Sequence, residues 1–225
     1  MRIQAARRLM TLKVVYYGPG RSGKTTNLRH LHDTVPESNR GALVTLDTET
    51  ERTLYFDYFP AVLGTVGGFK VKVDFFTVPG QSFYQATRRA VLEGADAVVF
   101  VADSRPSREV ANQVSRDDLV AQLASMGRSL DTLPHVYQWN KRDVPGAIPL
   151  STLEATLNPE GAPAVPAIAT NGRGVRTTQS LLLRQLLSTI EAQFAKRRRG
   201  GSRAAASAPP TSTSAGAVRP SALES

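Results

Sequence analysis

The sequence predicts an α/β protein with a mainly parallel six-stranded sheet, one antiparallel edge strand and helices on both faces. Short apolar runs alternate with longer segments of helical spacing. This alternation is typical of βαβ units, in which a helix connects parallel strands. The runs at 41–46 and 68–78 leave no room for a helix of normal length between them, so we expect them to form the antiparallel edge.

The predicted elements follow one another in a regular order. The first strand, LKVVYY at 12–17, precedes a Gly-rich loop and a helix that begins near Lys24. Further strands are expected at 41–46, 68–78, 96–104, 135–140 and 164–170, and further helices at 83–94, 108–127, 151–157 and 177–195. Residues 1–196 are predicted to form one domain. Beyond it the chain is rich in Ala, Ser, Pro, Thr and Gly, which predicts a disordered tail over 197–225.

The loop after the first strand, GPGRSGKTT at 18–26, fits the P-loop pattern G-x-x-x-x-G-K-[ST]. Glycines allow positive φ and bring backbone N–H groups close to phosphate oxygens, and the helix start favours an anion. Lys24 is predicted to neutralise the β- and γ-phosphates, and the Thr25 hydroxyl to coordinate Mg²⁺. The alternative is a Gly-rich turn that binds no ligand. The strand before the loop, the helix after it and the complete motif spacing favour the P-loop. The predicted nucleotide-binding residues of this loop are Gly18, Gly20, Gly23, Lys24, Thr25 and Thr26.

A second motif follows the fifth predicted strand, where Asn140, Lys141 and Asp143 fit N-K-x-D. The Asp143 carboxylate can accept hydrogen bonds from the N1–H and 2-amino groups of guanine, a donor pair that adenine lacks. Asn140 would connect the base to the P-loop, and the alkyl stem of Lys141 would cover one face of the base. The backbone N–H of Ala169, after the sixth strand, would meet guanine O6. Ligands bind beyond the carboxyl ends of such strands, so these motifs are expected to lie together and to select GTP over ATP.

With these motifs the chain resembles the Ras-like small GTPases, and more specifically the MglA family of bacterial GTPases that control cell polarity and gliding motility. The resemblance covers about residues 11–195 and rests on YYGPGRSGKTTNL, TLDTETERTLYFDYFP, TVPGQSFYQATR, VVFVADS and QWNKRDVP. It implies a P-loop G domain that binds GTP, GDP and Mg²⁺ and hydrolyses GTP slowly. It also implies a roadblock-type activating homodimer of the MglB kind, polarity or motility effectors, and recruitment from the cytoplasm to a cell pole.

One position departs from the general Ras-like pattern. The sequence Thr77-Val78-Pro79-Gly80 stands where D-x-x-G is usual, so the acid that helps to hold Mg²⁺ through water is missing. The MglA family shares the TVPGQ form and, as the resemblance implies, still hydrolyses GTP. Asp74 lies three residues earlier and is expected to face the other side of its strand. Asp57 is a candidate replacement, although nothing in the local sequence places it.

Catalysis of phosphoryl transfer requires a positioned water and positive charge near the phosphate. Lys24 is a candidate catalytic residue, and two further residues are candidates to act with it. Gln81 is placed to orient the water, and the N–H of the preceding Gly80 would contact the γ-phosphate. In the MglA family, an arginine at the position of Arg52 acts as an arginine finger, and the threonine at Thr53 senses γ-phosphate and Mg²⁺. The alternative for Arg52 is a surface ion pair with a neighbouring glutamate. If Arg52 is the finger, Arg52→Ala should lower GTP turnover and leave GTP affinity intact.

The composition limits the other possibilities. The formal charge of +9 is uneven, because the part from Lys196 onward carries +5, so a specific nucleic-acid site on the folded part is not expected. The run KRRR fits a solvated helix end or a weak contact with anionic lipid or nucleic acid. There is no cysteine for a disulfide or a thiolate metal site. No stretch has the roughly 18 apolar residues that span a bilayer, which predicts a cytoplasmic chain.

Two further interpretations of the function stay open on the sequence alone. A pseudo-GTPase would bind nucleotide as a static scaffold, since Thr77 replaces the usual acid. A P-loop ATPase is the other alternative, and NKRD argues against it. The aromatic stretch FDYFP at 56–60 fits either an interface or the protein core.

Overall fold

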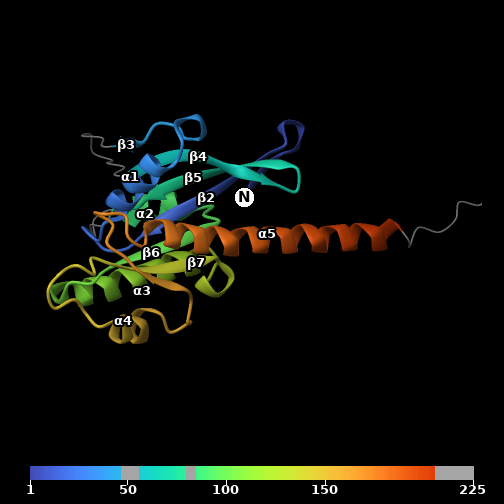
Figure 1. Ribbon diagram of the computed structural model, residues 1–225. Coiled ribbons are helices and arrows are strands. Elements are labelled where there is room, and N and C mark those ends of the chain that lie inside the picture. The colour runs from blue at the N-terminus through green and yellow to red at the C-terminus, as the bar shows by residue number, and fades with distance from the viewer. Residues whose placement is uncertain (47–55, 80–84, 206–225) are drawn as a thin grey trace, which may run out of the picture. The chain divides into compact units, whose positions relative to one another are not determined.

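The predicted α/β class is confirmed by a computed structural model that describes residues 1–46, 56–79 and 85–205 (Figure 1). The chain divides into two compact units, Met1–Thr189 and Ile190–Ser225. The first unit contains the whole sheet and every predicted site residue that the structure describes. It is therefore the unit that carries the candidate function.

The sheet has eight strands in the described part of the chain, mostly parallel. Their order is β3-β4-β5-β2-β6-β7-β8, and β1 pairs with β2 outside this path. Strands β5, β2, β6, β7 and β8 run parallel to one another, whereas β4 is antiparallel to both neighbours and β1 is antiparallel to β2. The bounds are β1 Arg2–Gln4, β2 Leu9–Tyr17, β3 Val44–Leu46, β4 Phe56–Val66, β5 Phe69–Thr77, β6 Ala97–Asp103, β7 His135–Asn140 and β8 Ala164–Pro166.

The antiparallel edge is present as predicted, but two details of the prediction were wrong. The sheet has β1 and β4 in addition to the six predicted strands. As a result, β3 and β5 do not pair with each other, because β4 lies between them and pairs with both. A three-residue strand such as β1 gives too short a pattern to recognise, and β4 contains Asp57, Pro60 and Gly64, which are rare in strands.

Pro60 is compatible with β4 because of where its backbone points. Strand β3 pairs only with Phe56–Tyr58, so it ends before Pro60. The Pro60 carbonyl instead accepts a hydrogen bond of 2.8 Å from the Gly41 N–H, outside the β3 ladder. In an antiparallel strand the N and O of a residue face the same side, so the missing N–H of proline removes no ladder bond.

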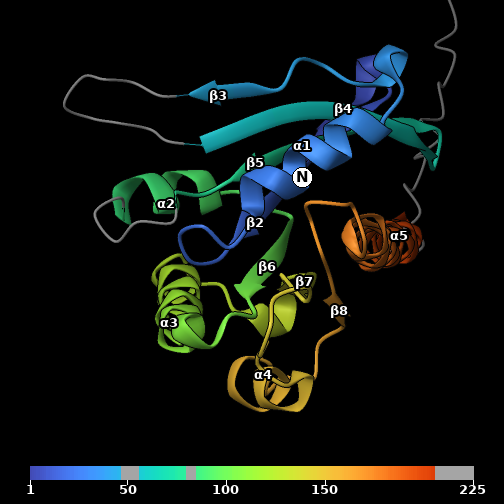
Figure 2. The ribbon, with the colours of Figure 1, turned by 60° about the vertical axis from the view of Figure 1, so that its left-hand side comes forward.

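Five α-helices in the described residues cover the sheet. Helix α1 and the part of α5 within the first unit lie on one face, and α2 and α3 lie on the other (Figure 2). Helix α4 packs beside α3. The bounds are α1 Lys24–Thr34, α2 Gln85–Leu92, α3 Glu109–Ser125, α4 Leu150–Leu157 and α5 Val175–Ala205.

The core holds the strand ends that carry the site in fixed positions. Every residue of β6 and of β7 is buried, as expected for central parallel strands covered on both faces. The aromatic stretch 56–60 packs within the sheet, where Phe59 stacks on Phe75 with ring centroids 5.0 Å apart. Phe56 and Tyr58 both contact the ring of Phe76. Phe59 therefore belongs to the core, whereas Phe56 and Tyr58 are only partly buried.

The last helix is longer than the sequence predicted. Helix α5 continues past the predicted domain boundary at residue 196 and ends at Ala205, so the KRRR run is helical. A disordered tail was predicted from residue 197; the structure assigns 197–205 to α5, and residues 206–225 lie outside the described part. Among the described helices, none is long and apolar enough to cross a membrane.

Candidate nucleotide-binding site

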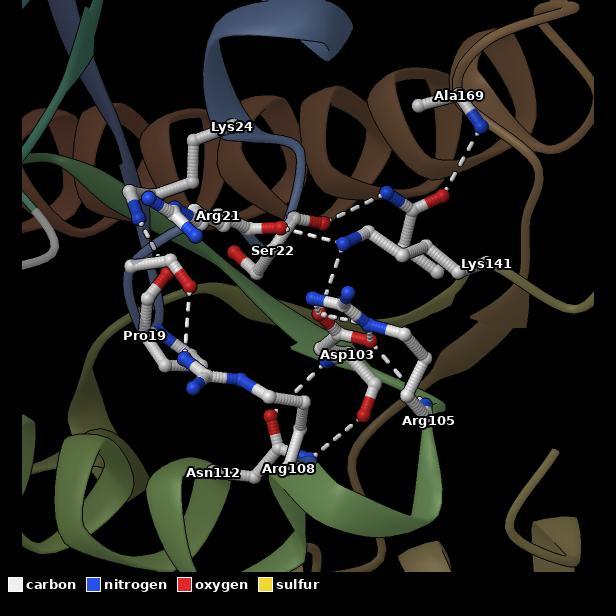
Figure 3. A network of polar contacts seen from close by, with 12 residues as sticks. Pro19, Arg21, Ser22, Lys24, Asp103, Arg105, Arg108, Asn112, Lys141 and Ala169 are labelled. Carbon is white, nitrogen blue, oxygen red and sulfur yellow. Dashed lines mark hydrogen bonds and ion pairs between the residues drawn. The ribbon is translucent and has the colours of Figure 1, made fainter. Parts of the chain in front are cut away.

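The predicted motifs meet at the carboxyl ends of β2, β6 and β7, as expected for a parallel sheet (Figure 3). The loop that follows β2 borders a cavity of about 430 Å³. This volume is within the usual range for small-ligand sites. The residues that line it are Arg21, Gly23, Lys24, Thr25, Thr26, Thr45, Phe56, Asp57, Thr77, Val78, Pro79 and Lys141.

The P-loop has a conformation that requires its glycines. Gly18 and Gly23 have φ of 134° and 103°, which L side chains rarely adopt. A Cβ on Gly18 would lie 2.2 Å from the Val101 carbonyl oxygen, and a Cβ on Gly23 would lie 2.3 Å from Asn140 Nδ2. The glycines therefore allow the loop to pack directly against the strand ends of the rest of the site.

We expect Gly23→Ala to destabilise the fold by about 2 kcal/mol, because it combines backbone strain with displacement of the Asn140 amide. The measurement is the free energy of unfolding in urea. Gly127→Ala is the matched control, since Gly127 also has positive φ but a Cβ there would meet no atom within 4 Å. Equal losses in the two variants would show that the contact between Gly23 and Asn140 adds nothing.

Lys24 is buried at the start of α1 and turns back over the loop. Its Nζ donates hydrogen bonds to the carbonyl oxygens of Gly18 at 2.8 Å and Pro19 at 2.7 Å. Burial lowers the pKa of Lys24 to about 7, although the Asp57 carboxylate opposes this effect. An anion in the cavity would favour the charged amine, as expected for a phosphate-binding lysine.

Nucleotide binding should therefore take up a proton above neutral pH. With a pKa of about 7, Lys24 is mostly neutral in the free chain at about pH 8, and a polyphosphate should restore its charge. The phosphates themselves, with a second pKa of about 6, are ionised at that pH. Calorimetry at about pH 8 in buffers of different ionisation enthalpy should show uptake of close to one proton. GTP affinity should accordingly fall as pH rises above 7, and a binding enthalpy independent of the buffer would contradict this assignment.

Asn140 connects the P-loop to the segment after β8, and its predicted role in tying the base to the P-loop stays a prediction. Its Nδ2 donates to the Ser22 carbonyl at 2.7 Å, and its Oδ1 accepts from the Ala169 N–H at 2.9 Å. The side chain is buried, so both bonds are made away from water. The Ala169 N–H, predicted to meet guanine O6, thus already has a partner in Asn140, and its contact with a base stays a prediction.

Lys141 lies against the P-loop in the left-handed conformation, with φ of 65°. Its Nζ donates to the Arg21 carbonyl and, at 2.8 Å, to Asp103 Oδ2. These bonds fix the position of its alkyl stem, the part predicted to cover one face of a base. Asp143, by contrast, is exposed, which leaves its carboxylate accessible to hydrogen-bond donors of a ligand.

Asp57 reaches the cavity from β4 and places a carboxylate beside Thr77. Its Oδ2 accepts hydrogen bonds from the hydroxyls of Thr25 at 2.6 Å and Thr77 at 2.9 Å, and its Oδ1 accepts one from Thr45 at 2.9 Å. Asp74 lies elsewhere, as predicted, and pairs with Lys72 at 3.0 Å. The buried carboxylate beside the Thr25 hydroxyl provides the oxygen ligands that Mg²⁺ prefers.

No cluster of three or more His, Asp or Glu side chains suited to a metal occurs in 1–46, 56–79 and 85–205. A magnesium ion would thus rely on Thr25, Asp57, phosphate oxygens and water, which is the usual way in which Mg²⁺ is held beside a nucleotide. Four predicted site residues, Arg52, Thr53, Gly80 and Gln81, lie outside the described residues. Their roles stay predictions.

Sequence reasoning missed a group of residues around Asp103, which is buried at the end of β6. Arg105 donates to both Asp103 carboxylate oxygens, and Asn112 holds its backbone with two bonds of 2.9 and 2.8 Å. Burial raises the pKa of Asp103, but the hydrogen bonds from Arg105 and Lys141 outweigh it and hold this pKa below its usual value. Since Asp103 is the direct strand neighbour of Asn140, its position at a strand end was the signal that could have found it.

Arg108, just before α3, was also missed. Its guanidinium donates a hydrogen bond of 2.8 Å to the carbonyl of Gly20, one of the predicted nucleotide-binding residues. Lys141 holds the next carbonyl, that of Arg21, from the other side. The P-loop backbone is therefore fixed by two cationic side chains as well as by Asn140.

The fold and this site define a P-loop nucleotide-binding protein of the α/β class. Over 189 residues the chain is 42% identical to the Mutual gliding-motility protein MglA of Myxococcus xanthus (strain DK1622). The matched region covers 84% of this chain and 97% of that protein. The chain belongs to the MglA family, which confirms the resemblance predicted from its motifs. A comparison with protein-family models gave no match.

Proposed function

We propose that this chain is a GTP-binding molecular switch that hydrolyses GTP to GDP and phosphate. The observation that carries the proposal is the Asn140 side chain, which joins the P-loop to the Ala169 segment beside an open Asp143 carboxylate. A base placed between Lys141 and that segment would present its hydrogen-bonding edge to Asp143. Guanine has two donors on this edge and adenine does not, so the arrangement favours GTP.

Hydrolysis needs little chemistry from the protein beyond positioning and charge. Water attacks the γ-phosphorus, the bond between this phosphorus and the β,γ-bridging oxygen breaks, and GDP leaves with phosphate. Lys24, held by two P-loop carbonyls, can move its amine onto the phosphate oxygens. Gln81 would orient the water and Arg52 would stabilise the charge that develops. Arg52→Ala is expected to reduce turnover while GTP affinity is retained.

Magnesium, held through Thr25 and Thr53 with Asp57 as the acid behind them, would neutralise the charge of the β- and γ-phosphates. In this chain the Asp57 carboxylate accepts a hydrogen bond of 2.6 Å from the Thr25 hydroxyl, so the two oxygen groups lie together beside the cavity. An acid in this position weakens the argument for a static pseudo-GTPase, which rested on Thr77.

The proposal is tested by single-turnover hydrolysis of labelled GTP by the purified chain, with Mg²⁺ and a large excess of unlabelled ATP. Slow hydrolysis that ATP does not suppress would support a GTP switch with its own catalytic residues. GTP that stays bound and intact would indicate a scaffold, or complete dependence on an activating partner. Displacement of the label by ATP would show that the assignment of Asn140 and Asp143 to guanine is wrong.

As a switch, the protein would act through loops that γ-phosphate orders and that relax after hydrolysis. The relative's name associates that protein with gliding motility, and we extend this role to the present chain. The expected partners are a roadblock-type activating homodimer of the MglB kind and effectors of polarity or motility. We place the chain in the cytoplasm with recruitment to a cell pole, where the basic tail from Lys196 could add a weak contact with anionic lipid.

A further inference from the structure

Four exposed basic residues gather where two turns of the sheet lie together. Arg2 belongs to β1, Arg7 and Arg8 belong to the turn that connects β1 to β2, and Lys70 is the second residue of β5. We call these four residues the basic hairpin surface. Figure 1 shows the β1–β2 and β4–β5 turns extending from the same end of the sheet.

The backbone holds these two turns against each other. The Lys70 N–H donates a hydrogen bond of 2.7 Å to the Arg8 carbonyl, and Leu9 pairs directly with Lys70 in the parallel register. The turn between β4 and β5 is formed by Gly67 and Gly68, both with positive φ and no side chain to cover the cations. The backbone segments that carry Arg8 and Lys70 are therefore held side by side, and both residues are exposed.

Within the described residues, none of the four cations of this surface forms an ion pair with an acid. The acids of the adjoining strands have other partners. Asp74 pairs with Lys72 at 3.0 Å, and Asp96 accepts a hydrogen bond of 2.8 Å from the Lys13 N–H. The surface thus keeps its positive charge toward solvent.

A cavity of about 500 Å³ adjoins the same surface along β4. Lys70 lines this cavity with a further cation, Arg176, and with Leu63, which is 36% exposed although its side chain is large and apolar. Thr34 and Thr65 add hydroxyl groups to the wall. Two cations, hydroxyls and an apolar side chain fit a phosphate headgroup that is attached to an acyl chain.

We propose that the basic hairpin surface binds the surface of an anionic phospholipid bilayer. Charge complementarity favours an acidic partner, and turns that extend from the end of a sheet can approach a flat surface without a matching groove. The exposed Leu63 can contact the acyl boundary, where aliphatic side chains bind peripheral proteins. Each Lys or Arg near an anionic surface contributes roughly a fivefold gain in affinity. The site is independent of the nucleotide cavity, with which it shares no residue.

The test is co-sedimentation of the full chain with vesicles of phosphatidylcholine alone or mixed with phosphatidylglycerol. We expect binding only to the mixed vesicles, and loss of binding as salt is added. The variant R7E/K70E should bind more than about 30-fold more weakly, since loss of two cationic contacts alone accounts for about that factor and the two new acids also repel the surface. GTP affinity should be unchanged, which separates failure of this inference from failure of the proposed GTP switch.

The matched control is R29E/R184E, which alters the net charge equally at exposed positions on α1 and α5. It should weaken binding much less than R7E/K70E, and an equal loss in the two variants would overturn the proposal. A second background, with Lys196, Arg197, Arg198 and Arg199 replaced by serine, separates the contribution of the tail. R7E/K70E must weaken binding there as well. Failure of the unaltered chain to bind mixed vesicles would overturn the proposal, even if the surface retained an acidic protein or a nucleic acid.

Discussion

Asp143→Asn is expected to change the base preference of this protein from guanine to xanthine. On the proposed assignment the carboxylate would accept hydrogen bonds from both donors of guanine, whereas an asparagine would place its own N–H groups against the 2-amino group. Xanthine has a carbonyl oxygen at that position, which the asparagine amide can bind. Because a site built to hydrogen-bond one group rejects the mismatched analogue strongly, GTP affinity should fall roughly 10⁴-fold and XTP should become the better ligand.

Competition between labelled XTP and unlabelled GTP measures this exchange directly. Asp131→Asn is the matched control, since Asp131 is exposed and lies in a short 3-10 turn before β7. It should leave the preference for GTP unchanged. A variant at Asp143 that still prefers GTP would show that NKRD is a polar turn without a role in base selection.

The geometry of the site follows from the sequence where local sequence determines local conformation. The P-loop is a continuous stretch whose glycines have positive φ and whose lysine begins a helix, so spacing alone was enough. Asn140 was predicted to tie a guanine base to the P-loop, and in the structure its Nδ2 donates a hydrogen bond of 2.7 Å to the Ser22 carbonyl of that loop. Strand-end geometry therefore extends sequence reasoning beyond a single motif.

The parts that sequence reasoning did not place depend on pairing between distant segments. Asp57 reaches the cavity because β4 pairs with β5, so that its backbone N–H bonds the Thr77 hydroxyl at 2.8 Å. No local pattern encodes this register, and Pro60 and Gly64 obscured the strand itself. Arg108 contacts Gly20 across 88 positions of sequence for the same reason. The long α5 was underestimated because basic and Gly residues after 195 resemble a linker.

Asp57→Asn should reduce Mg²⁺-dependent GTP hydrolysis by about 100-fold, the upper range for residues that orient the ligands of a metal. The asparagine amide does not carry the negative charge of the carboxylate. Its NH₂ group can only donate hydrogen bonds, whereas both carboxylate oxygens of Asp57 accept them, from three hydroxyls in all. The loss should appear as a higher Mg²⁺ requirement, measured by titration of the ion in single-turnover assays. Asp74→Asn, on the opposite face of the neighbouring strand, should have little effect.

The exchange Asp57→Thr with Thr77→Asp separates the position of the acid from its presence. Asp57 Oδ2 and Thr77 Oγ1 are only 2.9 Å apart, so the swapped carboxylate should approach Thr25 from β5 instead of β4. We expect the double variant to recover much of the hydrolysis that either single change removes. Such recovery is the coupling expected of residues that share one hydrogen-bonded network. If the losses of hydrolysis in the two single variants instead add up in the double variant, Asp57 stabilises β4 and does not replace the missing acid.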